Sequence, residues 1–592
     1  MKDFLKFTLA TVTGIIISSV VMFFMGILTL FSMVASSGSE TNIEKNSVMV
    51  LNLKGTLNER SEENPVNMLM GDDYSSYGLD DILASIEKAK ENENIKGIYI
   101  QADYLEAGFS SLEEIRHSLL DFKESGKFII AYADTYTQGL YYLSSVADKV
   151  LLNPKGMLEW RGLAASPVFY KDLLAKVGVE MQVFKVGTYK SAVEPYISTE
   201  MSAANREQIN AYLSSIWGQI TSDVAASRKL TVEELNAAAD RLLMFQPAEE
   251  CVKAGLVDTL MYKNDVRNYL KRAAGVEEDD SMPLLGLTEM INVKKNTPKD
   301  KSGNIIAVYY ATGGIVDGEE GSPLSTNEGP TIYSDKVIKD LRKLKEDEDV
   351  KAVVLRVNSP GGSAYGSEQI WYAVSELKKE KPVIVSMGDY AASGGYYISC
   401  NADTIVAEAT TLTGSIGIFG MVPNVKGLTD KLGLHFDVVK TNTYADFGTL
   451  GRPMNEGEKA AMQTYVNDGY DLFLTRCSDG RHISKEALDK IAQGRVWTGS
   501  TAKELGLVDE LGGLDKAMEI AIAKAGVETY TVQSYPAKES WMNSLMNLST
   551  NSYIKSQLKG TFGEMYEQFG ALKNIEQCDR LQARLPFELN IQ

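Results

Sequence analysis

The sequence predicts an α/β protein of two tandem domains, which arose by internal duplication and follow one transmembrane helix. Three observations predict this organisation: a segment that occurs twice, apolar strands that alternate with helices, and an uncharged N-terminal stretch. The chain has 592 residues, too many for one hydrophobic core. The repeated segment lies at 133–153 and again at 388–408, an offset of 255 residues. A period of that length indicates a duplicated domain and not a solenoid, whose repeats are about 20–50 residues long.

The first element is an N-terminal membrane anchor, predicted over residues 1–39. Residues 7–39 carry no charged side chain, and a helix that crosses a bilayer needs about 20 residues. A cleaved signal peptide is the alternative, but its apolar region is normally only about 7–15 residues long. Lys2 and Lys6 precede the stretch, and the next basic residue is Lys45. The positive-inside rule therefore places the N-terminus in the cytoplasm and the large domains on the extracytoplasmic side.

The two repeat domains are expected to contain mainly parallel sheets covered by helices. Each opens with an apolar strand, VMVLNLKG in the first and IIAVYYATG in the second. A charged helix, two more apolar strands and a further helix follow in both, and this alternation is typical of parallel sheets. The predicted boundaries, in chain order, are 40–292 for the N-terminal repeat domain, 293–304 for a charged linker, 305–536 for the C-terminal repeat domain and 537–592 for a helical tail.

The tail has weak amphipathic character over residues 540–569. We expect a helix there that packs on its own domain or on a neighbouring subunit. A helix lying on a membrane surface is the less favoured alternative.

Composition argues against several kinds of partner. The formal net charge of −19 disfavours nucleic-acid binding, which needs a basic face, and a solvated acidic surface accounts for it. No GxxxxGK[ST] motif occurs, so ATP is not an expected partner. Neither a structural metal site nor a cofactor is expected, because the four cysteines form no CxxC pair and no zinc-type cluster; they are Cys251, Cys400, Cys477 and Cys578. Scattered cysteines of this kind fit reduced, buried thiols.

The two copies differ at two positions that could carry chemistry. At the offset of 255 residues, Ser393 aligns with Gln138, and Ala445 aligns with Lys190. One copy keeps a hydroxyl and lacks an amine, and the other copy keeps the amine and lacks the hydroxyl. This complementary loss predicts one active site assembled from two half-sites.

Ser393 is the candidate nucleophile. It lies in GDYAASGGYY, directly after an apolar strand and at the start of a helix. Gly394 and Gly395 allow the backbone to approach a substrate closely, and the N–H of Gly394 could receive the oxyanion that forms when the serine attacks a carbonyl. The alternative interpretation is that Ser393 only caps the helix, as serine often does.

A second glycine element supports the catalytic interpretation. The segment NSPGGSAYGS at 358–367 also follows a strand, and its Pro-Gly-Gly turn exposes N–H groups suited to the other half of an oxyanion hole. Its counterpart at 103–110, DYLEAGFS, has lost the Pro-Gly-Gly run. The element therefore occurs in the copy that holds the serine and is absent from the copy that does not.

Lys190 is the candidate base. None of the three histidines, His117, His435 and His482, belongs to a motif, although a Ser-His pair stays open because distant residues can meet in a fold. A lysine acts as a base only when neutral, and its usual pKa of about 10.4 must be lowered by burial. An ordinary solvated lysine is the alternative. The surrounding Val, Lys, Thr and Tyr of VFKVGTYK (183–190) persist in VVKTNTYA (438–445), while Lys190 is replaced by Ala445.

The segments GTYKSAVEPY, MGDYAASGGYYIS and LTGSIGIFG together resemble the signal peptide peptidase A family of serine peptidases (family S49), in its long duplicated form with an N-terminal anchor. The resemblance covers nearly all of residues 7–536. It implies a Clp-protease/crotonase-like α/β fold in each repeat and a Ser/Lys dyad.

The family's functional residues carry over onto five positions. The resemblance implies that Ser393 is the nucleophile and Lys190 the general base. Gly394 and Gly362 would supply the oxyanion N–H groups, and Ser415, in TGSIG, would orient the lysine.

The resemblance further implies a serine endopeptidase of the bacterial cytoplasmic membrane, single-pass and without cofactors, which degrades cleaved signal peptides and other short apolar peptides. A homotetramer is expected, and the dyad can form only where the two copies meet. Two other functions are alternatives to this one. A crotonase-type acyl-CoA enzyme would share the fold but would not need the Ser/Lys pair, and a non-enzymatic membrane scaffold would form no covalent adduct at Ser393.

Overall fold

The computed structural model describes residues 41–61, 77–294, 302–319, 330–449, 451–538 and 581–584, and separate helical residues between positions 6 and 25. Within these residues, no helix is both long enough and apolar enough to cross a membrane. Most of the expected anchor, 1–39, and most of the tail lie outside the described residues, so both stay predictions.

The N-terminal repeat domain is built on a sheet of seven strands. Their bounds are β1 (Ser47–Asn58), β2 (Tyr77–Gly78), β3 (Ile95–Glu106), β4 (Phe128–Tyr136), β5 (Lys149–Leu158), β7 (Thr259–Leu260) and β8 (Leu284–Leu285). The order along the sheet is β2-β1-β3-β4-β5-β7, with β8 beside β1, and every pair is parallel.

Helices cover both faces of this sheet. Successive residues of a strand face opposite sides, so Met49 joins the large core under α3, α4 and α8, whereas Val48 packs with Val266 of α11 on the other face. Burial on both faces explains the continuous apolar character of the strands. The helices are α3 (Leu79–Glu91), α4 (Phe109–Lys123), α5 (Gln138–Ser144), α8 (Ala203–Arg228), α9 (Val232–Ala239), α10 (Glu249–Lys253), α11 (Lys263–Ala274) and α12 (Leu287–Ile291), with the 3-10 helix η2 (Leu243–Phe245).

The C-terminal repeat domain repeats this plan with eight strands. They are β9 (Ile305–Thr312), β12 (Val350–Ser359), β14 (Val383–Ala392), β15 (Thr404–Ala407), β16 (Leu412–Gly414), β18 (Val496–Thr498), β19 (Glu510–Leu511) and β20 (Thr531–Tyr535). The order is β18-β16-β14-β12-β9-β20, and only the pair β16–β18 is antiparallel among the pairs of this sheet. The expected α/β fold with two duplicated, mainly parallel sheets is confirmed.

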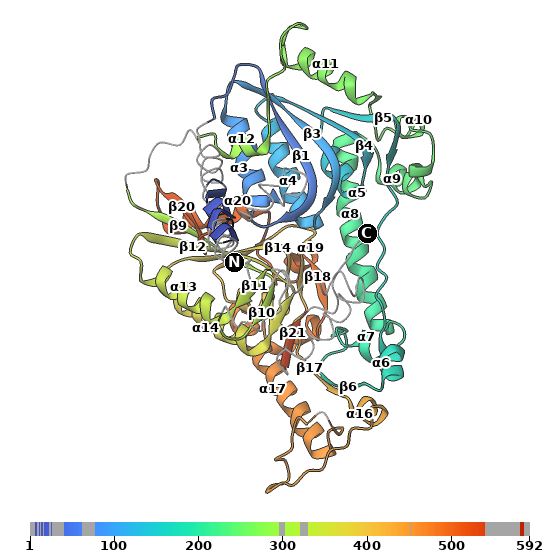
Figure 1. Ribbon diagram of the computed structural model, residues 1–592, viewed down its shortest axis with the longest axis vertical. Helices are drawn as coiled ribbons and strands as arrows, with labels where there is room; N and C mark the ends of the chain where they lie inside the picture. The colour runs from blue at the N-terminus through green and yellow to red at the C-terminus, as the bar shows by residue number, and fades with distance from the viewer. Residues whose placement is uncertain are drawn as a thin grey trace.

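The helices of this domain again cover two faces of the sheet. Val353 packs in the larger core, and its neighbour Val354 packs against Ala517 on the other face. The helices are α13 (Ser334–Glu346), α14 (Ala364–Lys378), α15 (Gly394–Ser399), α17 (Glu456–Arg481), α18 (Lys485–Ile491), α19 (Gly499–Glu504) and α20 (Leu514–Ala525). Figure 1 shows the two sheets one above the other along the long axis of the molecule.

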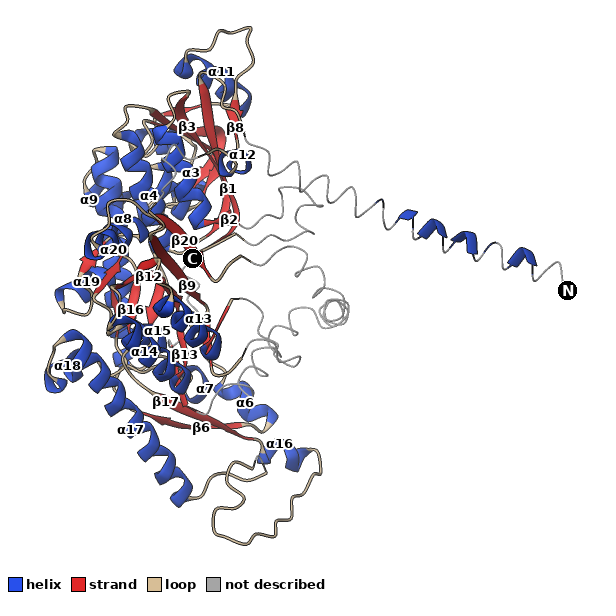
Figure 2. Ribbon diagram, turned by 90° about the vertical axis from the view of Figure 1, so that its left-hand side faces the viewer, coloured by secondary structure: helices blue, strands red, loops and turns tan. Residues whose placement is uncertain are grey.

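A third sheet contains strands from both domains and from the tail. Its strands are β6 (Glu180–Lys185), β10 (Gly314–Val316), β11 (Thr331–Tyr333), β13 (Gly361–Ser363), β17 (Phe419–Asn424) and β21 (Leu581–Arg584), in the order β11-β10-β13-β21-β17-β6. The N-terminal domain contributes β6, which lies beside short helices α6 (Lys171–Val177), α7 (Glu194–Ile197) and α16 (Lys426–Lys431) at the lower end of the molecule (Figure 2). We call β6 and the residues that follow it up to Lys190 the β6 arm. This arm extends from the first repeat domain and packs on the second.

One local expectation is wrong, and one repeated segment differs in structure from its counterpart. The tail residues of β21 form a strand and not part of a helix. The segment VVKTNTYA at 438–445, the counterpart of β6, forms no strand, and residues 433–445 are exposed. A strand needs a partner, and β6 occupies the edge of β17 that this segment would need within its own domain.

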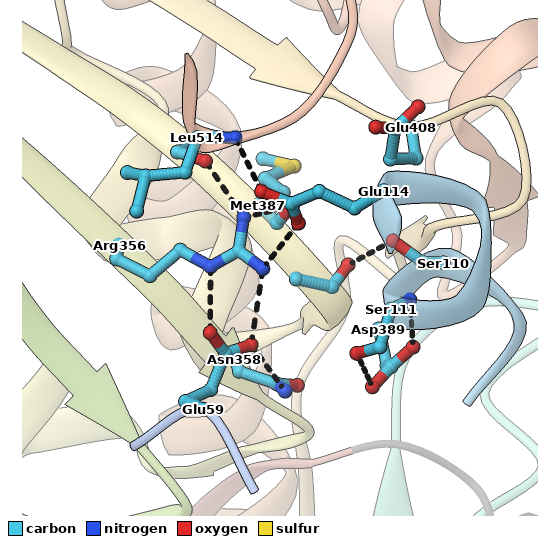
Figure 3. A network of polar contacts seen from close by, with 12 residues as sticks. Glu59, Ser110, Ser111, Glu114, Arg356, Asn358, Met387, Asp389, Glu408 and Leu514 are labelled. Carbon is cyan, nitrogen blue, oxygen red and sulfur yellow. Dashed lines mark hydrogen bonds and ion pairs between the residues drawn. The ribbon is translucent and has the colours of Figure 1, made fainter. Parts of the chain in front are cut away.

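A buried ion network joins the two domains (Figure 3). Arg356 of β12 donates to Glu59 and to Glu114 of α4, at 2.8 Å in each case, and all three side chains are almost fully buried. Asp389 of β14 accepts from the backbone and hydroxyl of Ser111 at 2.9 and 2.7 Å. The strands that lead to Ser393 are thereby fixed against the N-terminal domain.

Candidate active site

Ser393 lies between the end of β14 and the first residue of α15. Its φ of 55° and ψ of −112° are unusual for a residue with a side chain, and its N–H donates to Gly414 O at 2.8 Å. The side chain makes no cap hydrogen bond, so helix capping does not account for this serine. Ser393 is fully buried.

Lys190 reaches Ser393 from the other repeat. Its Nζ lies 2.8 Å from Ser393 Oγ, and it donates to the hydroxyl and the carbonyl of Ser415 at 3.1 Å each. The lysine is 0 % exposed, and burial holds its pKa well below the usual range. The alternative of a solvated surface lysine is therefore wrong.

The arm that carries Lys190 is fixed on both sides. Tyr189 donates its N–H to Gln493 O at 2.9 Å, and a Cβ on Gly494 would come within 2.6 Å of Lys190 Cβ. Gln208 of α8 donates to Tyr189 O at 3.0 Å. Close backbone packing therefore leaves the lysine side chain little freedom to leave Ser393.

Ser415 is placed to orient the lysine. Its N–H donates to Arg495 O at 2.7 Å, and its hydroxyl donates to Gly494 O at 3.2 Å. Since the hydroxyl proton points to Gly494, its lone pairs remain for the amine of Lys190. The counterpart in the first repeat, Trp160, is buried and donates to Leu235 O instead.

The two predicted oxyanion elements converge beside Ser393. A Cβ on Gly394 would come within 3.1 Å of Gly362 N, and a Cβ on Gly361 within 2.8 Å of Gly394 N. Gly361 also has a φ of 98°, which favours glycine. Two backbone N–H groups from β13 and α15 are therefore close together, with no room for a side chain between them.

The corresponding half-site of the first repeat has different contacts. Gln138 begins α5, and its Oε1 accepts the N–H groups of Arg161 and Gly162 at 3.0 Å each. A cavity of about 610 Å³ lies beside it. In Figure 1, α5 lies in the upper half of the molecule, and the loop between α16 and α17, which contains Ala445, lies at its lower tip, so Gln138 and Ala445 do not meet within one chain.

The histidines take no part in this site. Among the hydrogen bonds of the described residues, none joins a histidine to Ser393 or Lys190. His117 contacts Glu408 at 3.3 Å across the domain interface, next to Glu113, and this triad is the group of described residues that could hold a metal ion. Thr410 already donates to Glu113, and the contact of His117 with Glu408 is an ion pair when the imidazole is charged, so the cluster is accounted for without a metal.

Two contributors to the site carry no signal in the sequence. Gly494 and Arg495 receive hydrogen bonds from Ser415, and they lie in a turn with no counterpart motif. Strand β21 lies directly beside the glycine elements. Both depend on contacts between segments far apart in the chain, which local patterns do not show.

Comparison with known proteins identifies related chains. The profile of peptidase family S49 matches residues 121–277 and 375–528. "Protease 4" of Haemophilus influenzae is 35% identical over 543 residues, covering 88% of this chain and 86% of that protein. "Protease 4" of Salmonella typhi is 35% identical over 532 residues, covering 87% and 84%. "Putative signal peptide peptidase SppA" of Enterococcus faecium is 31% identical over 264 residues, covering 44% and 76%.

Proposed function

This chain belongs to peptidase family S49 and is a serine peptidase, and from that premise we propose that it is an endopeptidase with a Ser/Lys dyad. Ser393 is the nucleophile and Lys190 the general base. The observation that carries this proposal is the contact of 2.8 Å between Lys190 Nζ and Ser393 Oγ in a fully buried setting.

The mechanism follows from the state of the amine. Burial disfavours the charged form of Lys190, so the neutral amine has a lone pair to accept the hydroxyl proton. Ser393 Oγ then attacks the peptide carbonyl, and Lys190 passes the proton to the leaving amine. Water activated by the same lysine releases the acyl group from the serine. Ser415 holds the amine in line with the hydroxyl throughout.

The N–H groups of Gly394 and Gly362 stabilise the tetrahedral intermediate. They belong to two different elements and lie close together beside the nucleophile. Donors fixed in the backbone need no rearrangement as the negative charge forms, and one such donor contributes about 3–4 kcal/mol in serine peptidases.

The substrates are peptides, which we infer to be cleaved signal peptides and other short apolar peptides at a membrane. The similarity to a signal peptide peptidase supports this class. The uncharged stretch at 7–39 supports attachment by a single N-terminal helix, with the catalytic domains on the extracytoplasmic side. Each repeat is expected to have a Clp-protease/crotonase-like fold.

A homotetramer fits the surfaces that one chain leaves uncovered. Residues 433–445 repeat the sequence of the β6 arm but are exposed, with Val439 at 99%. The segment 164–169, the counterpart of β17, has no strand partner, and Val168 is 62% exposed. Pairing these two segments between copies gives a head-to-tail contact, which closes into a ring when the rotation allows. In such a contact Gln138 would face Ala445, and that interface would be inert.

Mass spectrometry after labelling with a serine-reactive phosphonylating reagent tests the function. We expect one adduct, on Ser393, that is lost in Ser393→Ala and strongly reduced in Lys190→Ala. Ser375→Ala, on α14, is the matched control and should label like the wild type. Absence of an adduct on Ser393 in the wild type, together with absence of peptide hydrolysis, would refute the proposal.

A further inference from the structure

A strand of the tail fills a slot in the shared sheet. β21 lies between β13 and β17 and is antiparallel to both. Gly362 lies opposite Ala583, and Phe419 lies opposite Gln582. In the order of this sheet among the described strands, β13 and β17 are joined through β21. The groove between them is therefore one strand wide and has a hydrogen-bonding edge on each side.

The carbonyl of Ala583 lies at the candidate oxyanion site. A Cβ on Gly361 would come within 2.1 Å of Ala583 O, and a Cβ on Gly394 within 3.1 Å of the same oxygen. The Cβ on Gly394 would also lie 3.1 Å from Gly362 N. The oxygen is thus beside both glycines that flank Ser393, and Ala583 itself is fully buried.

We propose that β21 is bound as a substrate of the chain's own active site, and that the bond between Ala583 and Arg584 is cleaved. The proposal rests on the peptidase function given above. Ser393 Oγ forms an ester with the carbonyl carbon of Ala583, and its proton passes through Lys190 to the departing nitrogen of Arg584. Water then hydrolyses the ester, which restores the serine hydroxyl and leaves a carboxylate on Ala583.

The same register defines how other peptides bind. An extended peptide adds a strand between β13 and β17, so affinity comes mainly from backbone hydrogen bonds. The residue that supplies the attacked carbonyl must be small, since the alanine at this position has no exposed surface. The substrate class is therefore extended peptides with a small residue on the N-terminal side of the cleaved bond.

Intact mass measurement of the full-length protein tests the inference. We expect the wild type to lose residues 584–592 and Ser393→Ala to retain them. Ala583→Phe should also retain them, because the larger side chain does not fit, whereas the matched variant Ala583→Gly should lose them. An unrelated peptide substrate is assayed in parallel with every variant.

The parallel assay separates the two proposals. A wild type that hydrolyses the added peptide but keeps residues 584–592, or is cut at another bond, overturns the inference and leaves the peptidase function intact. Loss of these residues from Ser393→Ala also overturns it. A wild type that cleaves neither substrate contradicts the proposed function itself.

Discussion

At the residue scale, the central feature is a lysine buried without a charged partner. Burial alone accounts for the lowered pKa of Lys190. Such a group costs folding free energy, and groups of this kind occur most often where chemistry needs them. Comparison of the two copies already pointed to this residue and to Ser393. The family resemblance also indicated Ser415, whereas the close packing of Gly494 against Lys190 could not be predicted, because it joins segments far apart in the chain.

Replacing the amine should remove activity and keep the fold. Lys190→Met retains a side chain of similar length, so we expect kcat/KM for a peptide substrate to fall by about 10²–10⁴-fold or more, since general-base catalysis contributes that much. Lys185→Met, on β6 of the same arm, is the control and should keep its activity. Circular dichroism checks the fold, and near-normal hydrolysis by Lys190→Met would rule out its role as the base.

The pH dependence of activity follows from the same amine. Because Lys190 is a base only when neutral, kcat/KM should rise as the pH increases through its lowered pKa, and the rise should end well below the range of an ordinary lysine. Below that pKa the amine is protonated and cannot accept the serine proton. Rates measured from about pH 5 to about pH 10, which brackets the usual lysine value, check this. A rise centred on the usual lysine pKa would show that the amine is solvated.

At the element scale, local patterns predicted the strands and helices of each repeat, and pairings between distant segments decided the rest. The parallel sheets follow from runs such as AVVLRVN, which are buried on both faces. The contact of β6 with β17 joins residues more than 230 positions apart, and no local pattern indicates it. The same reason explains why residues 438–445, whose sequence is similar to that of β6, form no strand: they lack a partner strand.

The ion network that joins β12 and α4 to Glu59, directly after β1, gives a prediction at this scale. Arg356→Ala leaves the buried carboxylates of Glu59 and Glu114 without their cation, which should lower the free energy of unfolding by about 3–5 kcal/mol. Burial already raises the pKa of Glu114, and without the arginine it should rise further. The loss should therefore be smaller at about pH 4, near the usual carboxyl pKa, where the carboxyl of Glu114, with its raised pKa, is neutral.

Urea unfolding at two pH values measures this effect. The exposed Arg342→Ala, on α13, serves as the control, and its free energy of unfolding should change by less than about 0.5 kcal/mol. Equal stability of Arg356→Ala and the wild type would show that the network contributes nothing to the interface.

At the scale of the whole molecule, the exposed segment 433–445 predicts that several copies of the chain assemble. Val439→Glu places a charge on the surface proposed to contact a second copy, so we expect light scattering to show a smaller particle than for the wild type. The Lys190–Ser393 pair lies within one chain, so the active-site serine should still react with a phosphonylating reagent. Lys440→Glu is a second variant on the same loop, where the lysine pairs with Asp446, and we expect it to reduce the particle size less than Val439→Glu does. An unchanged particle size for Val439→Glu would exclude this surface as the contact.

The distance in sequence between the two reacting groups has a consequence for biosynthesis. Lys190 and Ser393 are 203 positions apart. At roughly 5–20 residues per second, a ribosome needs about 10–40 s to travel from one to the other, and folding of the second half follows. A nascent polypeptide that ends before Ser393 therefore has no hydrolytic power. The reacting pair is completed only late in synthesis, once the second half of the chain has folded.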